Sequence, residues 1–174
     1  MATSHDVVKL HQRGIRKICD MVGQAIGLAT RSLADPTKTG GYFCLMDLQT
    51  GAILTTTIIG SVTPEKAIRY KWLAEEKALR LFRLHTLSDS PHISSYQSKD
   101  EKEDKWGGSV LGNRFIYSFS GFPQIIDEIA MLATALNFGD MPLDRAQEII
   151  LISKAQTLTA DEARARDAIL QITV

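Results

Sequence analysis

Histidines are the residues best suited to chemistry in this chain, and the four of them are scattered along it. His11 falls on the apolar stripe of a helix predicted over residues 6–31, where a neutral imidazole could ligate iron or reach a pocket. The alternative is a core histidine that bonds to a backbone carbonyl. His85 stands at the end of a second predicted helix, where a cation favours the helix dipole. No two histidines have the i, i+4 spacing of a zinc site, so no metal site is predicted.

A second group of polar residues surrounds a break between a predicted strand and a predicted helix. Ser120 and Gly121 end the strand, and Asp127 and Glu128 stand near the N-terminus of the helix. The favourable interaction of each carboxylate with the helix dipole, about 0.3–1 kcal/mol, is enough to explain why two acidic residues stand there. The functional interpretation is the polar end of a pocket, where backbone N–H groups beside Ser120 and Gly121 hold a carboxylate or propionate. A glycine at such a break can also serve geometry alone.

Two cations complete the set of candidate ligand-binding residues. Lys77 lies in the second predicted helix and could point to the same pocket, although a lysine on a helix is normally solvated. Arg114 begins the strand before Ser120 and could pair either with an acidic ligand or with an Asp or Glu of the chain. The sequence shows no Ser-His-Asp order, Cys-His pair, phosphate loop or dinucleotide fingerprint, so no catalytic residue is predicted. An enzyme acting on a small organic acid would rest on fold analogy alone.

The stretch from Asn113 to Phe138 must position most of these side chains. Phe115, Tyr117 and Phe119 alternate with smaller residues, a period of two that predicts a strand. Ser-Gly-Phe-Pro then breaks the strand, and apolar residues at helical spacing predict a helix that ends before Gly139. The prediction is a central strand that runs through a glycine elbow into a buried helix.

The remaining elements predict an α+β fold with a mostly antiparallel central sheet flanked by helices. Residues 63–84 form the second helix, with Ile68 expected on its buried face and Lys77 on its wet face. Residues 86–105 are polar and predict a lid or a mobile segment. The other elements are strands at 42–46, 52–59 and about 106–111, and helices at 142–155 and from 159. Residues 1–139 are predicted to form one α+β domain, with 140–174 as a helical extension packed on it.

Composition excludes several classes of function. The 174 residues are enough for a single domain with a core, and the net charge of zero gives no basic field for nucleic acid. The N-terminus lacks the pattern of a secretory signal, and no apolar run is long enough to span a membrane. Cys19 and Cys44 lack metal-ligand spacing and are expected to be small core residues. These features predict a cytoplasmic protein with no nucleic-acid or membrane partner.

The order of five short motifs resembles the GlcG/HbpS-type family, the haem-degrading-domain family of small profilin-like proteins also found at the end of PduO-type proteins. The resemblance spans about residues 5–138, and the order of the motifs carries it more than any one of them. The motifs are Leu45-Met46-Asp47 turning at Gly51, Gly60 after the second strand, Lys77-Ala78, Gly107-Gly108, and Ser120-Gly121 followed by Asp127-Glu128.

The resemblance implies a small-ligand-binding or accessory protein, for which haem or a related tetrapyrrole is a possible ligand. Separately, the chain is expected to form a homo-oligomer. The chain departs from the family pattern at two places. Ser109-Val110 stands where a proline is usual, and large rings stand at Phe115, Tyr117 and Phe119 where small residues are usual. Those rings could fill the space of a ligand. The alternative hypothesis is therefore a cofactor-free homo-oligomeric scaffold, in which apolar helices after Gly139 bury a partner surface.

Overall fold

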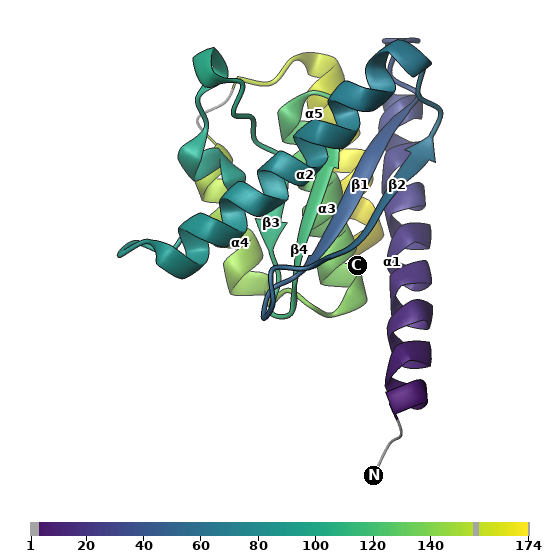
Figure 1. Ribbon diagram of the computed structural model, residues 1–174. Helices are drawn as coiled ribbons and strands as arrows, with labels where there is room; N and C mark the ends of the chain where they lie inside the picture. The colour runs from purple at the N-terminus through teal and green to yellow at the C-terminus, as the bar shows by residue number, and fades with distance from the viewer. Residues whose placement is uncertain (1–3, 155–156, 174) are drawn as a thin grey trace.

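An antiparallel sheet of four strands in the order β2-β1-β4-β3 lies at the centre of the chain (Figure 1). The computed structural model describes residues 4–154 and 157–173, with side chains from residue 12 onward. The strands are β1 (Gly40–Asp47), β2 (Ile53–Gly60), β3 (Ser109–Leu111) and β4 (Phe115–Ser120). The prediction of an α+β fold with an antiparallel sheet is confirmed.

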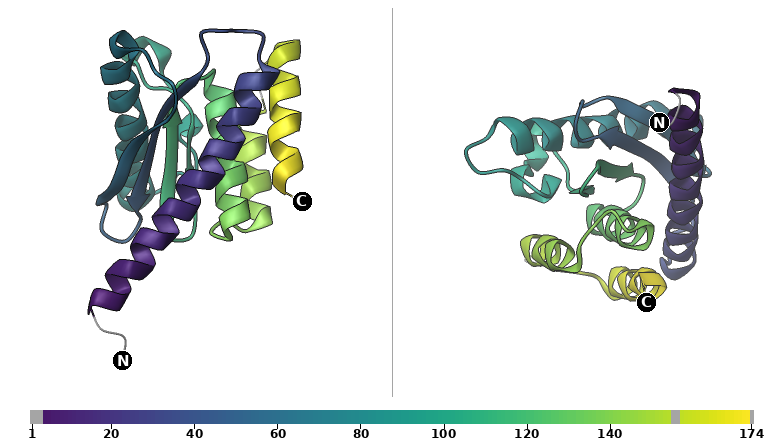
Figure 2. Two further views of the ribbon diagram at one scale, coloured as in Figure 1. Left: turned by 90° about the vertical axis from the view of Figure 1, so that its right-hand side faces the viewer. Right: turned by 90° about the horizontal axis from the view of Figure 1, so that it is seen from below.

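Helices cover both faces of this sheet (Figure 2). One face carries α2 (Pro64–Leu87), which packs on β1, β4 and β3. The other face carries α1 (Ser4–Ser32) and α3 (Gln124–Phe138), and α5 (Ala160–Leu170) packs outside them. α4 (Leu143–Ser153) lies against α3, and the N-terminal end of α1 projects beyond the rest of the fold. None of the described helices is long and apolar enough to cross a membrane.

The alternation predicted for β4 decides which layer each of its side chains enters. Phe115, Tyr117 and Phe119 point to the layer of α1 and α3, where they are buried in the main core. Ile116 points to the opposite face and joins the smaller cluster under α2. Ser118 lies on that same face and donates a hydrogen bond to the Ala74 carbonyl at 2.7 Å. The three rings therefore fill the interior, as the departure from the family pattern suggested.

The glycine elbow is built as predicted. After β4 the chain turns at Gly121, and α3 begins at Gln124 with Pro123 as its N-cap. A Cβ at Gly121 would lie 2.4 Å from the Gly40 carbonyl oxygen, so only glycine lets the elbow pass this close to β1. Gly139 ends α3 in the left-handed conformation with φ 77°.

Three predictions for α2 and its following segment are wrong. Ile68 is 82% exposed and lies on the solvent face, whereas Lys77 is buried. Residues 86–105 are not a structureless lid or mobile loop, because 86–87 end α2 and the rest holds two 3-10 helices, η1 (Ser95–Ser98) and η2 (Glu101–Glu103). The Arg80 guanidinium holds this segment against α2 by donating to the carbonyls of Ser95, Ser98 and Trp106.

The C-terminal part begins and continues with helices as predicted. The capping box at Thr159 and Glu162 is present, with the Thr159 hydroxyl accepting from the Glu162 N–H at 3.2 Å and the Glu162 carboxylate accepting from the Thr159 N–H. Ala165 and Ile169 of α5 are buried in the main core beside α1 and α3. The predicted end of α4 at residue 155 lies outside the described residues.

Candidate functional site

Four of the predicted ligand-binding residues meet at one place, which we call the elbow pocket. It is a cavity of about 250 Å³ beside the C-terminal end of β4, lined by Lys77, Ser120, Gly121 and Asp127 together with residues of α2 and the start of α3. The residues come from α2, β4 and α3, and Lys77 of α2 is more than 40 residues before the other three in the sequence. The grouping of these four side chains was an inference from sequence, and the geometry brings them together.

The floor of the elbow pocket is a buried ion pair whose hydrogen bonds are already made. The Lys77 ammonium lies 3.2 Å from the Asp127 carboxylate and donates to the Phe119 carbonyl at 2.8 Å. Asp127 also accepts from the Phe122 backbone N–H at 3.0 Å, which fixes the elbow. Burial lowers the pKa of Lys77 and raises the pKa of Asp127, against the attraction between them. The pair joins α2, β4 and α3, and it has little capacity left for a ligand.

The double glycine of the sequence motif serves this same pair. Gly108 has φ 118°, and a Cβ there would lie 2.8 Å from the Asp127 Cβ and 3.0 Å from the Lys77 ammonium. A Cβ at Gly107 would lie 2.3 Å from the ring of Tyr96, so the ring covers the backbone at this point. Gly108 is therefore required by close packing around the buried charge pair, and Gly107 by the close approach of the Tyr96 ring.

Glu128 does not belong to the elbow pocket, which corrects its predicted place. Its carboxylate is fully buried, and one oxygen accepts from the Ser94 hydroxyl at 2.5 Å. The other oxygen has no hydrogen-bond partner among the described residues. Burial raises the pKa of Glu128 to about 7, although the hydroxyls of Ser153 and Ser94 lower it in part. The Ser153 hydroxyl itself bonds to the Ile149 carbonyl at 3.3 Å.

Arg114 stands at the opposite end of β4 from Ser120, so the two cannot share one pocket. Its Nε donates to Asp140 at 3.2 Å, and its backbone N–H donates to the same oxygen at 3.1 Å. The other Asp140 oxygen accepts from the Phe115 N–H and the Tyr117 hydroxyl, each at 3.1 Å. Arg114 was predicted to pair either with an acidic ligand or with an acid of the chain, and the structure shows the pair with Asp140. The sequence analysis missed Asp140, although an acid directly after the helix-ending Gly139 was a visible signal.

A second cavity, which we call the α1 cavity, lies between α1 and the end of β4 where Arg114 stands. Its volume is about 370 Å³, and it is lined by Arg13, Gly14, Ile15, Lys17, Ile18, Arg114, Phe115 and Phe138. The Arg114 guanidinium lies 5.2 Å from the centre of the Phe115 ring and 5.7 Å from that of Phe138. The Lys17 ammonium lies 5.9 Å from the centre of the Phe138 ring. The cavity therefore has aromatic walls and a cationic rim.

His11 precedes Ile15 of the α1 cavity by four residues, which is one turn of α1. The side chain of His11 lies outside the described residues. Among the described residues, no group of three His, Cys, Asp or Glu side chains could hold a metal ion.

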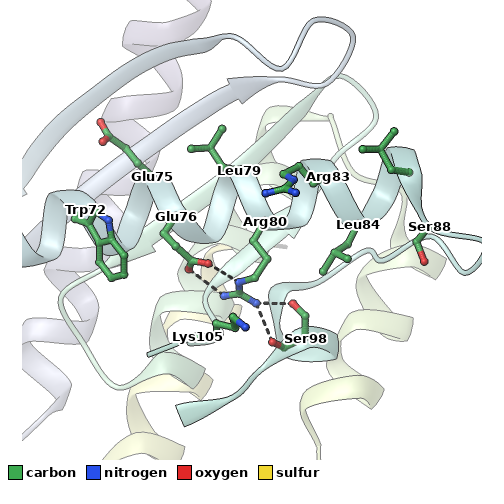
Figure 3. A pocket seen from close by; sticks show the side chains of 11 residues that line it. Trp72, Glu75, Glu76, Leu79, Arg80, Arg83, Leu84, Ser88, Ser98 and Lys105 are labelled. Carbon is green, nitrogen blue, oxygen red and sulfur yellow. Dashed lines mark hydrogen bonds and ion pairs between the residues drawn. The ribbon is translucent and has the colours of Figure 1, made fainter. Parts of the chain in front are cut away.

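A third depression runs along α2 and contains none of the predicted site residues (Figure 3). This groove of about 820 Å³ is lined by Trp72, Leu79 and Leu84 of α2, and by Ser98 and Lys105 of the following segment. Arg80 spans it, bonding to Glu76 at 2.7 Å and to the Ser98 hydroxyl at 2.5 Å.

The fold and its cavities define an α+β protein with a four-stranded antiparallel sheet, a closed charge pair at one end of β4 and a cation-rimmed aromatic cavity at the other. No family model, curated protein or solved structure matches this chain. The resemblance to the GlcG/HbpS-type family therefore stays a prediction from the order of the sequence motifs.

Proposed function

We propose that this protein binds a planar apolar molecule that carries carboxylates, and that the ligand occupies the α1 cavity. The observation that carries this proposal is the combination of two phenyl rings, Phe115 and Phe138, with three cations at the rim. The volume of about 370 Å³ falls within the usual range of small-molecule sites. A small-ligand-binding or accessory role of this kind agrees with the resemblance to the GlcG/HbpS-type family.

Charge at the rim favours an acidic ligand. Arg13, Lys17 and Arg114 bring three positive charges to the cavity, and all three residues are exposed. Asp140, the acid that pairs with Arg114, is buried and already accepts four hydrogen bonds. A carboxylate of a ligand would meet guanidinium and ammonium donors with the charge-assisted geometry that these groups favour.

The walls favour a flat ligand. Phe115 and Phe138 have their ring centres 6.5 Å apart with their planes at 51°, and both rings border the cavity. An aromatic ring system can stack on one of them in the offset arrangement that aromatic pairs prefer. Gly14 lines the opposite side, where a Cβ would lie 3.8 Å from the Phe138 ring, so the absence of a side chain keeps this space open.

Haem, the ligand implied by the resemblance, fits these residues in part. The aromatic walls suit an edge of the macrocycle, and the cations suit its propionates. The cavity is too small to enclose the whole group, so haem would be half-exposed. His11 is the imidazole that the sequence offers as an axial ligand, one turn before the cavity.

Titration of the purified protein with hemin and with iron-free protoporphyrin IX tests this proposal. Hemin should give a ligation-type Soret shift that His11→Ala abolishes, whereas protoporphyrin binding should be insensitive to His11→Ala. Gly14→Leu fills the cavity and should abolish binding of both. Lys17→Ala should weaken binding by about 3–10-fold, and the matched control Arg16→Ala, on an exposed residue that does not line the cavity, should not. Spectra that stay those of free hemin and porphyrin would reject the proposal.

We keep the homo-oligomer expected from sequence as a second candidate function, that of a scaffold. The observation that favours it is an uncharged edge strand, β2, rather than the helices after Gly139 on which the expectation first rested.

A further inference from the structure

Asp140 is an acid that the fold holds in place from several sides. It directly follows Gly139, whose left-handed backbone ends α3, and it is only 1% exposed. Its backbone carbonyl accepts from the Asn113 N–H at 2.6 Å, in the turn between β3 and β4. A Cβ at Gly112, in the same turn, would lie 2.2 Å from the Asp140 carboxylate, so only glycine lets the turn pass this close. The position of this carboxylate is therefore set by the fold before any ligand is bound.

Three of the four hydrogen bonds to the Asp140 carboxylate fix the start of β4. They come from the backbone N–H groups of Arg114 and Phe115 and from the buried Tyr117 hydroxyl, each at 3.1 Å. The fourth comes from the Arg114 Nε at 3.2 Å, and the side chain of Arg114 is 63% exposed. An ion pair with so exposed a partner normally adds little to stability, so this bond does more to orient Arg114 than to stabilise the fold.

The guanidinium of Arg114 is oriented by contacts on three sides. Asp140 takes Nε, and the centres of the Phe115 and Phe138 rings lie 5.2 and 5.7 Å from the guanidinium carbon. Nη1 and Nη2 have no hydrogen-bond partner among the described residues. Because Nε is taken, the donors that remain are the end-on fork of Nη1 and Nη2, which matches the two oxygens of a carboxylate.

Arg80 shows how an arginine with a structural role is bonded in the same fold. Its Nε and both terminal nitrogens donate to the Glu76 carboxylate and to backbone carbonyls of the segment after α2. Arg114 instead leaves both terminal nitrogens unbonded within the described residues, beside the α1 cavity. A donor group that is held in place in advance loses less conformational entropy when a ligand binds, and this raises affinity.

We propose that Asp140 is a positioning residue of the α1 cavity, which holds the Arg114 guanidinium by Nε so that Nη1 and Nη2 bind one carboxylate of the ligand end-on. This inference rests on the proposed function and makes it more specific, because it assigns one side chain to one chemical group of the ligand. Arg13 and Lys17, the other cations of the rim, have no anchoring acid among the described residues, so they supply charge without this orientation.

Binding of protoporphyrin IX and of its dimethyl ester, measured side by side, tests this role. The two ligands share the macrocycle and only the free acid has carboxylates, so the ratio of their dissociation constants isolates the carboxylate contribution. The wild type should prefer the free acid. Asp140→Asn should weaken binding of the free acid by about 10-fold and of the ester by less than about 2-fold, whereas a folding defect would weaken both. The matched control Asp104→Asn breaks an ion pair of 2.8 Å with Arg69, away from the cavity, and should leave the ratio unchanged.

Two variants of the arginine keep the test decisive if Asp140→Asn folds poorly. Arg114→Lys keeps a positive charge at this exposed position but lacks both the Nε–H and the fork, so it should also lower the preference for the free acid by about 10-fold. In an Arg114→Met background, Asp140→Asn should have no further effect on the ratio, because the residue through which it acts is gone.

Each outcome separates the role of Asp140 from ligand binding itself. Binding of both ligands with a ratio that Asp140→Asn and Arg114→Lys leave unchanged would overturn this role while the proposed function stood. A ratio that Asp140→Asn still lowers in the Arg114→Met background would overturn it as well. If the wild type bound neither ligand, the proposed function and this inference would be rejected together.

Discussion

The buried carboxylate of Glu128 should make the stability of this protein fall as pH rises through neutrality. Burial raises the pKa of Glu128 from an ordinary value of 4.5 to about 7 in the folded chain. The folded chain then holds a proton that the unfolded chain has released, so stability is full below pH 4.5 and is lost as pH rises through about 7. Raising the pKa of a carboxyl from 4.5 to about 7 corresponds to about 3 kcal/mol.

Glu128→Gln removes this ionisation while preserving the shape of the side chain. The amide oxygen can still accept from the Ser94 hydroxyl, and the amide nitrogen takes the place of the oxygen that lacks a partner. We expect the variant to be about as stable as the wild type at about pH 4.5, and more stable by about 3 kcal/mol at about pH 8.5. With a urea slope of about 2 kcal/mol/M, the unfolding midpoints should separate by about 1.5 M.

Urea unfolding followed by circular dichroism at a series of pH values measures this difference. The control is Glu103→Gln, the same substitution on an exposed residue of η2, which should change stability by less than about 0.5 kcal/mol throughout. Comparing variant with wild type at each pH cancels the titration of all other groups. A difference between Glu128→Gln and wild type that stays constant from acid to alkaline pH would refute the assignment of a desolvated carboxyl at this position.

Two further predictions concern the elbow. Lys77→Met and Asp127→Leu should each cost about 3–5 kcal/mol because each leaves the other charge buried and unpaired, and the double variant should cost much less than their sum; additive losses in urea unfolding would show that the two charges are not coupled. Gly121→Ala should lower the melting temperature, because its Cβ would lie 2.4 Å from a carbonyl of Gly40, whereas Gly14→Ala should raise it by about 2–4 °C through helix propensity. Equal melting temperatures for these two alanine variants would contradict the close approach at the elbow.

Local patterns were enough to predict the central strand, the elbow and α3. The alternation of Phe115, Tyr117 and Phe119 describes a strand with one apolar face. Gly121 marks the turn that leads into α3, and Gly139 marks the end of α3. These features depend on residues close in sequence, so periodicity and turn chemistry capture them. The antiparallel class followed from the same patterns, because short turns between strands allow little else.

The burial of Lys77 was missed for a different reason. Lys77 follows Ala74 by three residues and precedes Leu81 by four, so helical spacing already placed it on the buried face of α2. Its charge favoured an exposed position, because a lysine is rarely buried without an oppositely charged partner. The partner, Asp127, is 50 residues away, and its approach depends on the complete sheet.

The distance between the two ends of β4 also could not be predicted from residue types alone. Arg114 and Ser120 flank a strand of six residues, which is about 20 Å long. Both residues were candidates for an acidic ligand, and residue types alone do not show that the strand between them holds them apart. The walls and rim of the α1 cavity also include Arg13, Lys17 and Phe138, none of which has a motif that would single it out.

The residues that carry the resemblance to the GlcG/HbpS-type family therefore play a different part from the residues that could bind a ligand. Lys77 and Asp127 pair at the elbow, where Gly108 leaves space for the pair, Gly121 lets the turn pass close to β1, and Asp127 fixes the turn into α3. Such an arrangement can persist in proteins with unrelated ligands, because it stabilises the fold and leaves the surface unchanged. Selectivity would depend on the side chains of the α1 cavity, where a change at Gly14 alters the available space without touching the elbow.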